Sequence, residues 1–173
     1  ESSTYDDMKK LMIPGLLLLA MLLYGCPYGS TVPIDEPRFP AIRSLFGQWK
    51  QPNLEKSYAA VSRYQMRDTM RYRVVYNSWT AEKGSYQVKI FKAQMSEVAG
   101  AYFFNIAPES KTSAPYFILG IRWNQAKDSL WLRPVNGEGA PRFSDSPALK
   151  SWIAANMTKK DFFEPEEVFV RAQ

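Results

Sequence analysis

Hydrophobic and polar residues alternate with a period of two through much of the chain after residue 44. In the segment 70–76, methionine, tyrosine and valine alternate with arginine, and the segment 86–90 follows the same rhythm. Alternation of this kind, bounded by turn residues, is typical of half-buried β-strands. The pattern predicts eight strands, of which the second also fits a helix: about 45–50, 57–66, 69–77, 85–94, 100–106, 116–123, 128–134 and 167–171.

The connections between these predicted strands are short. Residues 82–85 ("EKGS") can form a tight hairpin with Gly84 at positive φ, and residues 124–128 ("NQAKD") can form another. A parallel sheet would need helical crossovers, and the middle of the chain has no pattern for one. The sequence therefore predicts a mainly β fold, an antiparallel meander of seven or eight strands. Because an open sheet would expose its edges, we expect it to curl into a barrel or half-barrel.

One helix is predicted near the end of the chain, at about 147–158. Ser146 is a suitable N-cap, and Pro147 suits the first helical position. Hydrophobic residues then recur on one face, at Leu149, Trp152, Ile153 and Met157. We expect this face to pack on the sheet or to plug one end of a barrel.

An apolar run at 11–25 follows two lysines and is interrupted by a Pro-Gly pair. It is shorter than the about 20 apolar residues that a bilayer-spanning helix needs. Basic residues, a short apolar run and a small residue are the order of a secretory signal. We therefore expect residues 1–25 to be a leader containing a signal helix. Residues 1–7 are partly acidic and precede the first methionine, so we expect the native start at Met8.

The leader ends at the only cysteine of the chain, Cys26. Leu23-Tyr24-Gly25-Cys26 resembles the lipobox of bacterial lipoproteins, although Tyr24 departs from the usual small residue. The resemblance implies a diacylglycerol on the Cys26 thiol, cleavage before Cys26 and acylation of the new amino terminus. Two or three acyl chains give stable membrane attachment. The alternatives are an uncleaved short membrane helix and a plain secretory signal that is cut elsewhere.

A lipoprotein of this kind would lie in the bacterial cell envelope, attached to the membrane through Cys26. In bacteria with two membranes, the family sorting rules favour the periplasmic side of the outer membrane, because proline rather than aspartate follows the cysteine. Residues 26–44 contain four prolines, which forbid helix and disfavour strand pairing. We expect this range to be an extended tether, followed by a single domain at 45–173.

The first predicted strand opens with "LFGQWK" at 45–50. Its Gly47-x-Trp49 resembles the G-x-W element at the start of lipocalins and other calycin-type barrels, in which the tryptophan packs across the closed end. The overall order also resembles small lipocalin-like lipoproteins of bacteria, many of them uncharacterised. The resemblance implies a barrel that is either filled by its own side chains or holds one small ligand. We favour the filled interior.

The composition excludes several kinds of active site. The chain has no histidine, which removes Ser-His-Asp and Cys-His catalysis and the commonest zinc sites. No P-loop and no G-x-G-x-x-G motif is present. Most carboxylates fall in predicted turns, where they are usually solvated. We therefore expect no enzymatic activity, no cofactor and no metal.

Two groups of residues are candidates for ligand binding. Arg71 and Arg73 would point to the same face of one strand, and Lys89 could extend that patch from the next strand. This patch would be an anion-binding face or simply a solvated outer face, and we favour the latter. The second group is aromatic and would line an apolar pocket or pack in the core: Tyr102, Phe104 and Trp123.

The chain carries a formal net charge of +5. This charge suits anionic lipid headgroups or cell-wall polymers, and it also suits ordinary solubility. Nucleic acid is not an expected partner of an exported lipoprotein. The first functional hypothesis is a lipid-anchored, non-enzymatic envelope protein that binds a protein or polymer partner. The alternative is a lipocalin-like carrier of a small apolar ligand, and a carboxylate-based hydrolase ranks last.

Overall fold

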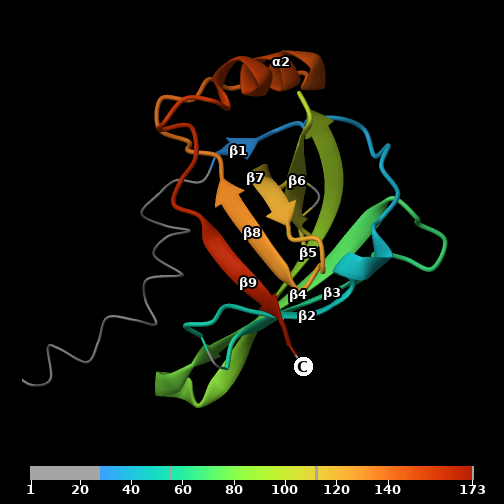
Figure 1. Ribbon diagram of the computed structural model, residues 1–173, viewed down its shortest axis with the longest axis vertical. Coiled ribbons are helices and arrows are strands. Elements are labelled where there is room, and N and C mark those ends of the chain that lie inside the picture. The colour runs from blue at the N-terminus through green and yellow to red at the C-terminus, as the bar shows by residue number, and fades with distance from the viewer. Residues whose placement is uncertain (1–27, 55, 112, 173) are drawn as a thin grey trace, which may run out of the picture.

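A computed structural model of the chain describes residues 28–54, 56–111 and 113–172 (Figure 1). The predicted leader, with its signal helix, and Cys26 lie outside these residues. Within them, nine strands, two short 3-10 helices and one α-helix follow one another: β1 (Gly29–Ser30), η1 (Arg43–Leu45), β2 (Gly47–Lys50), β3 (Tyr58–Arg63), β4 (Arg71–Thr80), η2 (Ala81–Lys83), β5 (Ser85–Val98), β6 (Ala101–Pro108), β7 (Tyr116–Trp123), β8 (Ser129–Pro134), α2 (Ser146–Asn156) and β9 (Glu167–Arg171). None of the helices in this part of the chain has the length and apolar character needed to cross a bilayer.

Strands β2 to β9 form a closed antiparallel barrel. Each pairs with the next along the chain, and β9 returns to pair with β2, where Arg171 lies opposite Trp49. The short strand β1 pairs with β7 outside this ring. The predicted antiparallel, lipocalin-like barrel is therefore confirmed, and the segment that also fitted a helix is strand β3. Closure leaves none of the eight barrel strands with a free edge over its whole length.

The barrel separates two hydrophobic clusters. The inner cluster contains the buried side chains Leu45, Trp49, Tyr72, Ala93, Met95, Phe104, Ile121, Leu130 and Phe169. The outer cluster joins the outer wall of the barrel to α2 and the N-terminal segment through Tyr28, Ile34, Val98, Phe103, Ile118, Val135, Leu149, Ile153 and Phe162. Figure 1 shows α2 above the barrel, beside β1 and the end of β5. The helix therefore packs on the sheet, as expected, with Leu149 and Ile153 fully buried.

The N-cap of α2 differs from the predicted one. Asp145, rather than Ser146, has the extended backbone of a cap, and its carboxylate accepts a hydrogen bond from the Ala148 amide at 2.9 Å. Both residue types cap helices well, so the sequence alone does not choose between them. The Ser146 hydroxyl instead donates to the Pro33 carbonyl at 2.7 Å. This bond ties the start of the helix to the N-terminal segment.

The described part of the proline-rich range, residues 28–44, is not an extended tether. Ile34 is fully buried, Tyr28 is 5% exposed, and Gly29–Ser30 pair with β7. The Tyr28 amide donates to the Val135 carbonyl at 2.9 Å, which fixes the segment to the barrel. Proline prevents a helix here, but it does not prevent an extended chain from burying apolar side chains. The folded domain therefore includes residues expected to lie in the tether.

Candidate ligand site in the barrel

One end of the barrel is closed by Trp49 and Arg171. The Trp49 indole is almost wholly buried, and its Nε1 donates to the Leu45 carbonyl at 2.9 Å. The Arg171 guanidinium lies over the indole ring, with Cζ 4.6 Å from the ring centroid. Arg171 also donates to the Phe46 carbonyl at 3.0 Å and to the Ser44 carbonyl. These contacts lock the segment before β2 against the last strand.

Gly47 is required at this end for a steric reason. Its φ is +130°, and a Cβ built on it would lie 2.7 Å from Nη1 of Arg171. A side chain here would therefore strain the backbone and displace the guanidinium from Trp49. This explains physically why glycine stands two residues before the tryptophan.

Inward side chains change from buried in the middle of the barrel to half-buried toward the end where β4 turns into β5. At the opposite rim, Tyr102 is 36% exposed and Trp123 is half-buried. Register and alternation identify the inward side chains: Tyr72 pairs with Ala93, Phe104 with Leu119, and Ile121 with Leu132. On each of five strands one inward residue is buried and the next one toward the β4–β5 turn is only half-buried, in the pairs Tyr72 and Val74, Ala93 and Phe91, Phe104 and Ile106, Ile121 and Leu119, and Leu130 and Leu132.

The middle of the barrel is therefore filled by its own side chains, and the half toward the β4–β5 turn is not. Half-burial of an inward side chain means that solvent-sized space borders it. We call this space the cup and define its apolar wall as Val74, Phe91, Ile106, Leu119 and Leu132. The expected filled interior is found only at the level of the inner cluster.

Polar groups also point into the barrel at the end that contains the cup. Gln51 donates through Nε2 to Oε2 of Glu167 at 2.9 Å, and Glu167 lies opposite Leu132 of the cup. The Tyr76 hydroxyl and Oε1 of Gln51 are buried without a hydrogen-bond partner among the described residues. Buried polar atoms normally find partners, so these two atoms are left for a bound molecule, which would have to displace the side chains that cover them.

Burial changes the pKa values of Glu167 and Tyr76. It raises the pKa of the Glu167 carboxyl, which the hydrogen bond from Gln51 partly offsets. It also raises the pKa of the Tyr76 hydroxyl, and the negative charge of Glu167 adds to this effect. The hydroxyls of Ser57 and Ser78 lie close enough to lower the Tyr76 pKa slightly, yet neither has hydrogen-bond geometry with Tyr76. Tyr76 is therefore a neutral donor.

The three aromatic candidates lie together, but nearer the closed end than the cup. Tyr102 stacks on Trp123 with ring centroids 5.3 Å apart. Phe104 meets Tyr72 edge-on at 5.3 Å in the inner cluster. These contacts show packing, and the cup residues beyond them were not among the candidates. The signal for the cup was present in the alternation of the strands, but the sequence did not reveal which inward positions stay unfilled.

The three cationic candidates do not form one patch. Arg71 and Arg73 lie on the outer face, whereas Lys89 pairs with Tyr76 and points inward. The residue opposite Arg73 is Lys92. Extension of the patch by Lys89 is therefore wrong, because moving a strand by one residue reverses the face of every side chain. Arg73 pairs with Glu109 at 3.4 Å.

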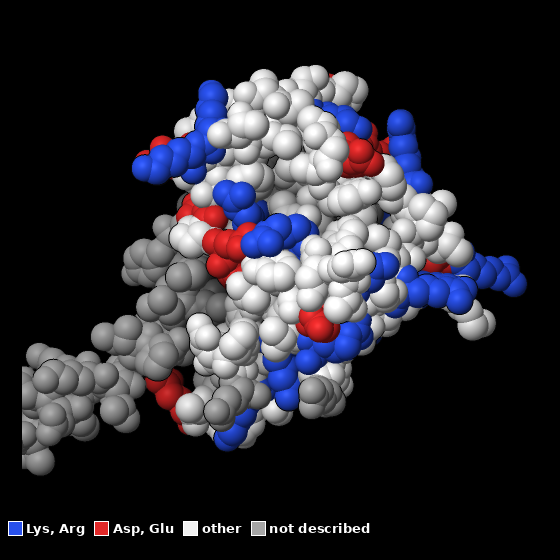
Figure 2. Space-filling model, viewed as in Figure 1, with Lys and Arg blue, Asp and Glu red and all other residues white. Residues whose placement is uncertain are grey.

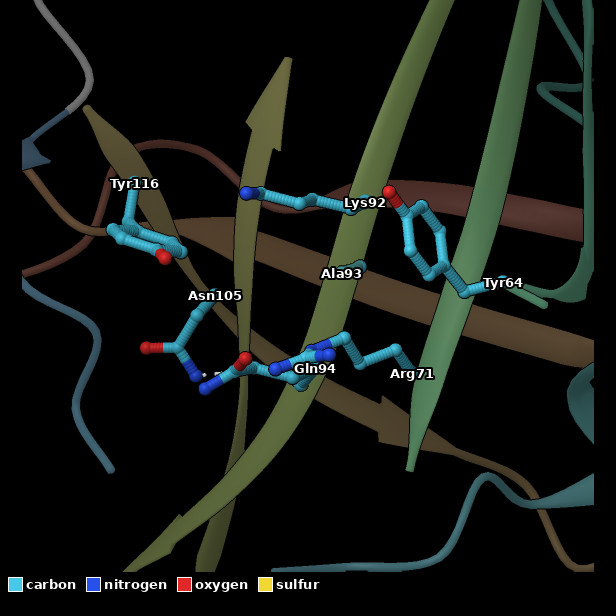
Figure 3. A pocket seen from close by; sticks show the side chains of 7 residues that line it. All are labelled: Tyr64, Arg71, Lys92, Ala93, Gln94, Asn105 and Tyr116. Atoms are coloured by element: carbon cyan, nitrogen blue, oxygen red, sulfur yellow. Dashed lines mark hydrogen bonds between the residues drawn. The ribbon is translucent and has the colours of Figure 1, made fainter. Parts of the chain in front are cut away.

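Arg71 instead borders a pocket on the outer face of the barrel (Figure 3). Its volume is about 150 Å³, and it is lined by Tyr64, Arg71, Lys92, Ala93, Gln94, Asn105 and Tyr116. Of these residues, only Arg71 was a candidate for binding an anion, and Tyr116 was expected to line an apolar pocket or to pack in the core. Outward polar side chains on a strand normally face solvent, and the sequence did not show that the segment near Ile34 covers them.

The described residues hold no metal centre, and the face seen in Figure 2 carries no single basic stripe. Among the residues that the structure describes, no three His, Cys, Asp or Glu side chains gather where they could hold a metal ion. Figure 2 shows lysine and arginine side chains spread over the visible face, with acidic side chains between them. The positive net charge is therefore not concentrated in one stripe on that face.

Comparison of the chain with protein-family models, with curated proteins and with solved structures found no match.

Proposed function

We propose that this protein is a non-enzymatic, lipid-anchored binding protein of the bacterial cell envelope that carries a small apolar ligand in its barrel. The observation that carries the proposal is the change from buried to half-buried inward side chains along the strands. A barrel filled by its own side chains would leave half-buried inward side chains chiefly at its rims, whereas each of these five has a further inward residue beyond it on its strand. Five half-buried apolar side chains around one space instead suit an apolar ligand.

The polar groups of the cup restrict the chemistry of that ligand. Tyr76 offers a hydroxyl donor, and Oε1 of Gln51 offers an acceptor, and both are buried without partners among the described residues. A hydroxyl or amide head can satisfy both atoms. A carboxylate head would meet the negative charge of Glu167 when that group is ionised. Lys89, which points inward opposite Tyr76, would attract the same carboxylate. The proposed ligand is therefore an aliphatic chain with a small polar head, neutral or anionic.

The proposed location depends on the leader and on the lipobox-like sequence before Cys26. An acylated Cys26 would hold the cup beside the membrane from which an apolar ligand is taken or to which it is given. In bacteria with two membranes we place the protein on the periplasmic side of the outer membrane. The cup supports a small ligand as the bound species over a protein or polymer partner.

Binding can be tested on the protein as the expressing cell delivers it, solubilised in a neutral detergent. A fluorescent fatty alcohol is titrated into the protein, and dodecanol and dodecanoate are then used as competitors. We expect saturable binding that both dodecanol and dodecanoate displace, and the better competitor identifies a neutral or an anionic head. Absence of saturable probe binding would contradict the proposed carrier function.

The anchor has a separate test. The mass of the native polypeptide should lack residues 1–25 and carry added acyl chains at Cys26. A Cys26→Ala variant should leave the membrane fraction or retain its leader. An intact leader with an unmodified thiol in the native protein would rule out the proposed anchor and leave the cup to be tested independently.

A further inference from the structure

The outer pocket is separated from the cup by the barrel wall. Its floor comes from β5 and β6, whose residues Gln94 and Asn105 pair across the sheet and face outward. Arg71 of β4 lies opposite Gln94, so it borders the same floor from the other side. Tyr64 and Tyr116 complete the lining. The pocket therefore forms where β4, β5 and β6 lie side by side.

The floor of the pocket is fixed by buried amides. Asn105 is 1% exposed and Gln94 is 6% exposed. The Asn105 Oδ1 accepts from the Ile34 amide at 2.7 Å, and its Nδ2 donates to the Ser96 hydroxyl at 2.9 Å. Gln94 donates through Nε2 to the Asp35 carbonyl at 2.6 Å. These bonds hold the floor in place without a ligand, so the pocket is preformed.

The two cationic side chains of the pocket keep unused hydrogen-bond donors. Arg71 uses Nη1 to contact Asp68 at 3.2 Å, and its Nε and Nη2 make no hydrogen bond with the described residues. Lys92 makes no ion pair with any of the described residues. Figure 3 shows the Arg71 guanidinium beside the Gln94 side chain, while the Lys92 side chain extends toward Tyr116. Two cations thus approach one space from different strands.

We infer that this pocket binds a phosphate group. An arginine, a lysine and two tyrosine hydroxyls offer donors in several directions, which suits a tetrahedral oxyanion better than a planar carboxylate. The volume of about 150 Å³ far exceeds the about 15 Å³ that one water needs. It is smaller than the about 300 Å³ of pockets that enclose a whole small molecule. The pocket therefore takes an inorganic phosphate or the phosphate of a larger molecule.

The test uses the detergent-solubilised protein and two sources of phosphate. In the first arm, inorganic phosphate is titrated into the protein, and binding is followed by the heat released or by NMR chemical shifts. A titration with sodium chloride at the same ionic strength is the control. In the second arm, the protein is titrated with micelles that contain phosphatidylglycerol. Saturation by inorganic phosphate identifies free phosphate as sufficient, and saturation only by the lipid identifies the headgroup. Either result supports the inference if the measured binding weakens when Lys92 is replaced.

The dependence on Lys92 is measured with three variants. Lys92→Gln should weaken phosphate affinity by about tenfold or more, and Lys92→Arg should keep it within a few-fold. Lys83→Gln, in the exposed η2 turn, makes the same change in charge and should leave affinity within about twofold. Equal weakening by Lys92→Gln and Lys83→Gln, or no saturation in either arm, overturns the inference.

This outcome is independent of the carrier function. Lys92→Gln should leave displacement of the fluorescent alcohol by dodecanol unchanged, because Lys92 lies on the outer face opposite Arg73. Loss of probe binding in that variant would show that the substitution disturbs the barrel. The Lys92→Arg variant would then decide the inference, because it keeps the charge and the stem of the side chain.

Discussion

Arg171 and Trp49 are paired positions on the last and first strands of the barrel, and the guanidinium lies 4.6 Å from the indole centroid. The contact lies at the β9–β2 pairing, where the sheet closes on itself. Arg171 also reaches the carbonyls of Phe46 and of Lys127, in the turn between β7 and β8, the latter at 3.3 Å. One side chain thus joins the segment before β2, a distant turn and the last strand.

Replacing Arg171 should therefore lower the free energy of unfolding much more than replacing an exposed arginine. Arg171→Gln leaves partly buried carbonyls without a donor and removes the cation–π contact, so we expect a loss of about 2 kcal/mol or more in the free energy of unfolding. Arg122 is the matched control, because its Cζ lies 4.2 Å from the Trp131 centroid and it pairs with Glu166 on the surface.

Arg122→Gln should change the free energy of unfolding by no more than about 0.5 kcal/mol, because exposed ion pairs contribute little. Urea denaturation of both variants, with comparison of midpoints and slopes, measures the difference. Equal losses would mean that the Arg171 contacts do not hold the barrel closed.

A substitution of Gly120 should destabilise the protein less when Phe163 is also made smaller. A Cβ at Gly120 would lie 2.9 Å from Cε1 of Phe163, which also stacks on Phe103 with ring centroids 6.2 Å apart. Gly120→Ala should destabilise the protein by about 1–3 kcal/mol through overpacking. In the Phe163→Leu background the same change should cost about 1 kcal/mol less. Additive losses in a double-mutant cycle would contradict this steric account.

Glu167 should make the stability of the fold depend on pH. Burial raises the pKa of its carboxyl above the ordinary 4.5, so the folded protein binds that proton more tightly than the unfolded chain does. The contribution of Glu167 to stability therefore falls as pH rises from below the ordinary value through the raised one. Glu167→Gln removes this effect and keeps an acceptor.

We expect the stability of Glu167→Gln relative to the wild type to increase between about pH 4 and about pH 7. Urea denaturation of both proteins at each pH measures the difference and cancels the contribution of other groups. A relative gain by the wild type over the same interval would show that the Glu167 carboxylate is stabilised, not disfavoured, by its surroundings.

Filling the cup should abolish binding of the proposed ligand. Leu132→Trp adds bulk to a half-buried inward position, so affinity for the fluorescent alcohol should fall by about tenfold or more. Val170→Trp makes a similar addition on the outward face of β9, where Val170 is 36% exposed, and should leave affinity within about twofold. If both variants bind the probe like the wild type, the cup is not the binding site.

Local pattern in the sequence determined the elements of this fold. Alternation of apolar and polar residues places side chains on two faces of a strand whatever lies beyond, so the strands containing Tyr72 and Phe104 were predicted. The helix containing Leu149 and Ile153 was predicted from its spacing in the same way. Short connections then implied antiparallel pairing, and closure followed from the exposed edges.

Only the tertiary structure decided which residues meet. Strand register placed Lys92 rather than Lys89 opposite Arg73, because a shift of one residue exchanges the two faces. Burial of Ile34 turned part of an expected tether into a cover for Asn105. The unfilled half of the barrel depends on the summed volumes of side chains from many strands. Pattern is a property of neighbours in the chain, whereas register, cover and cavity depend on residues far apart in it.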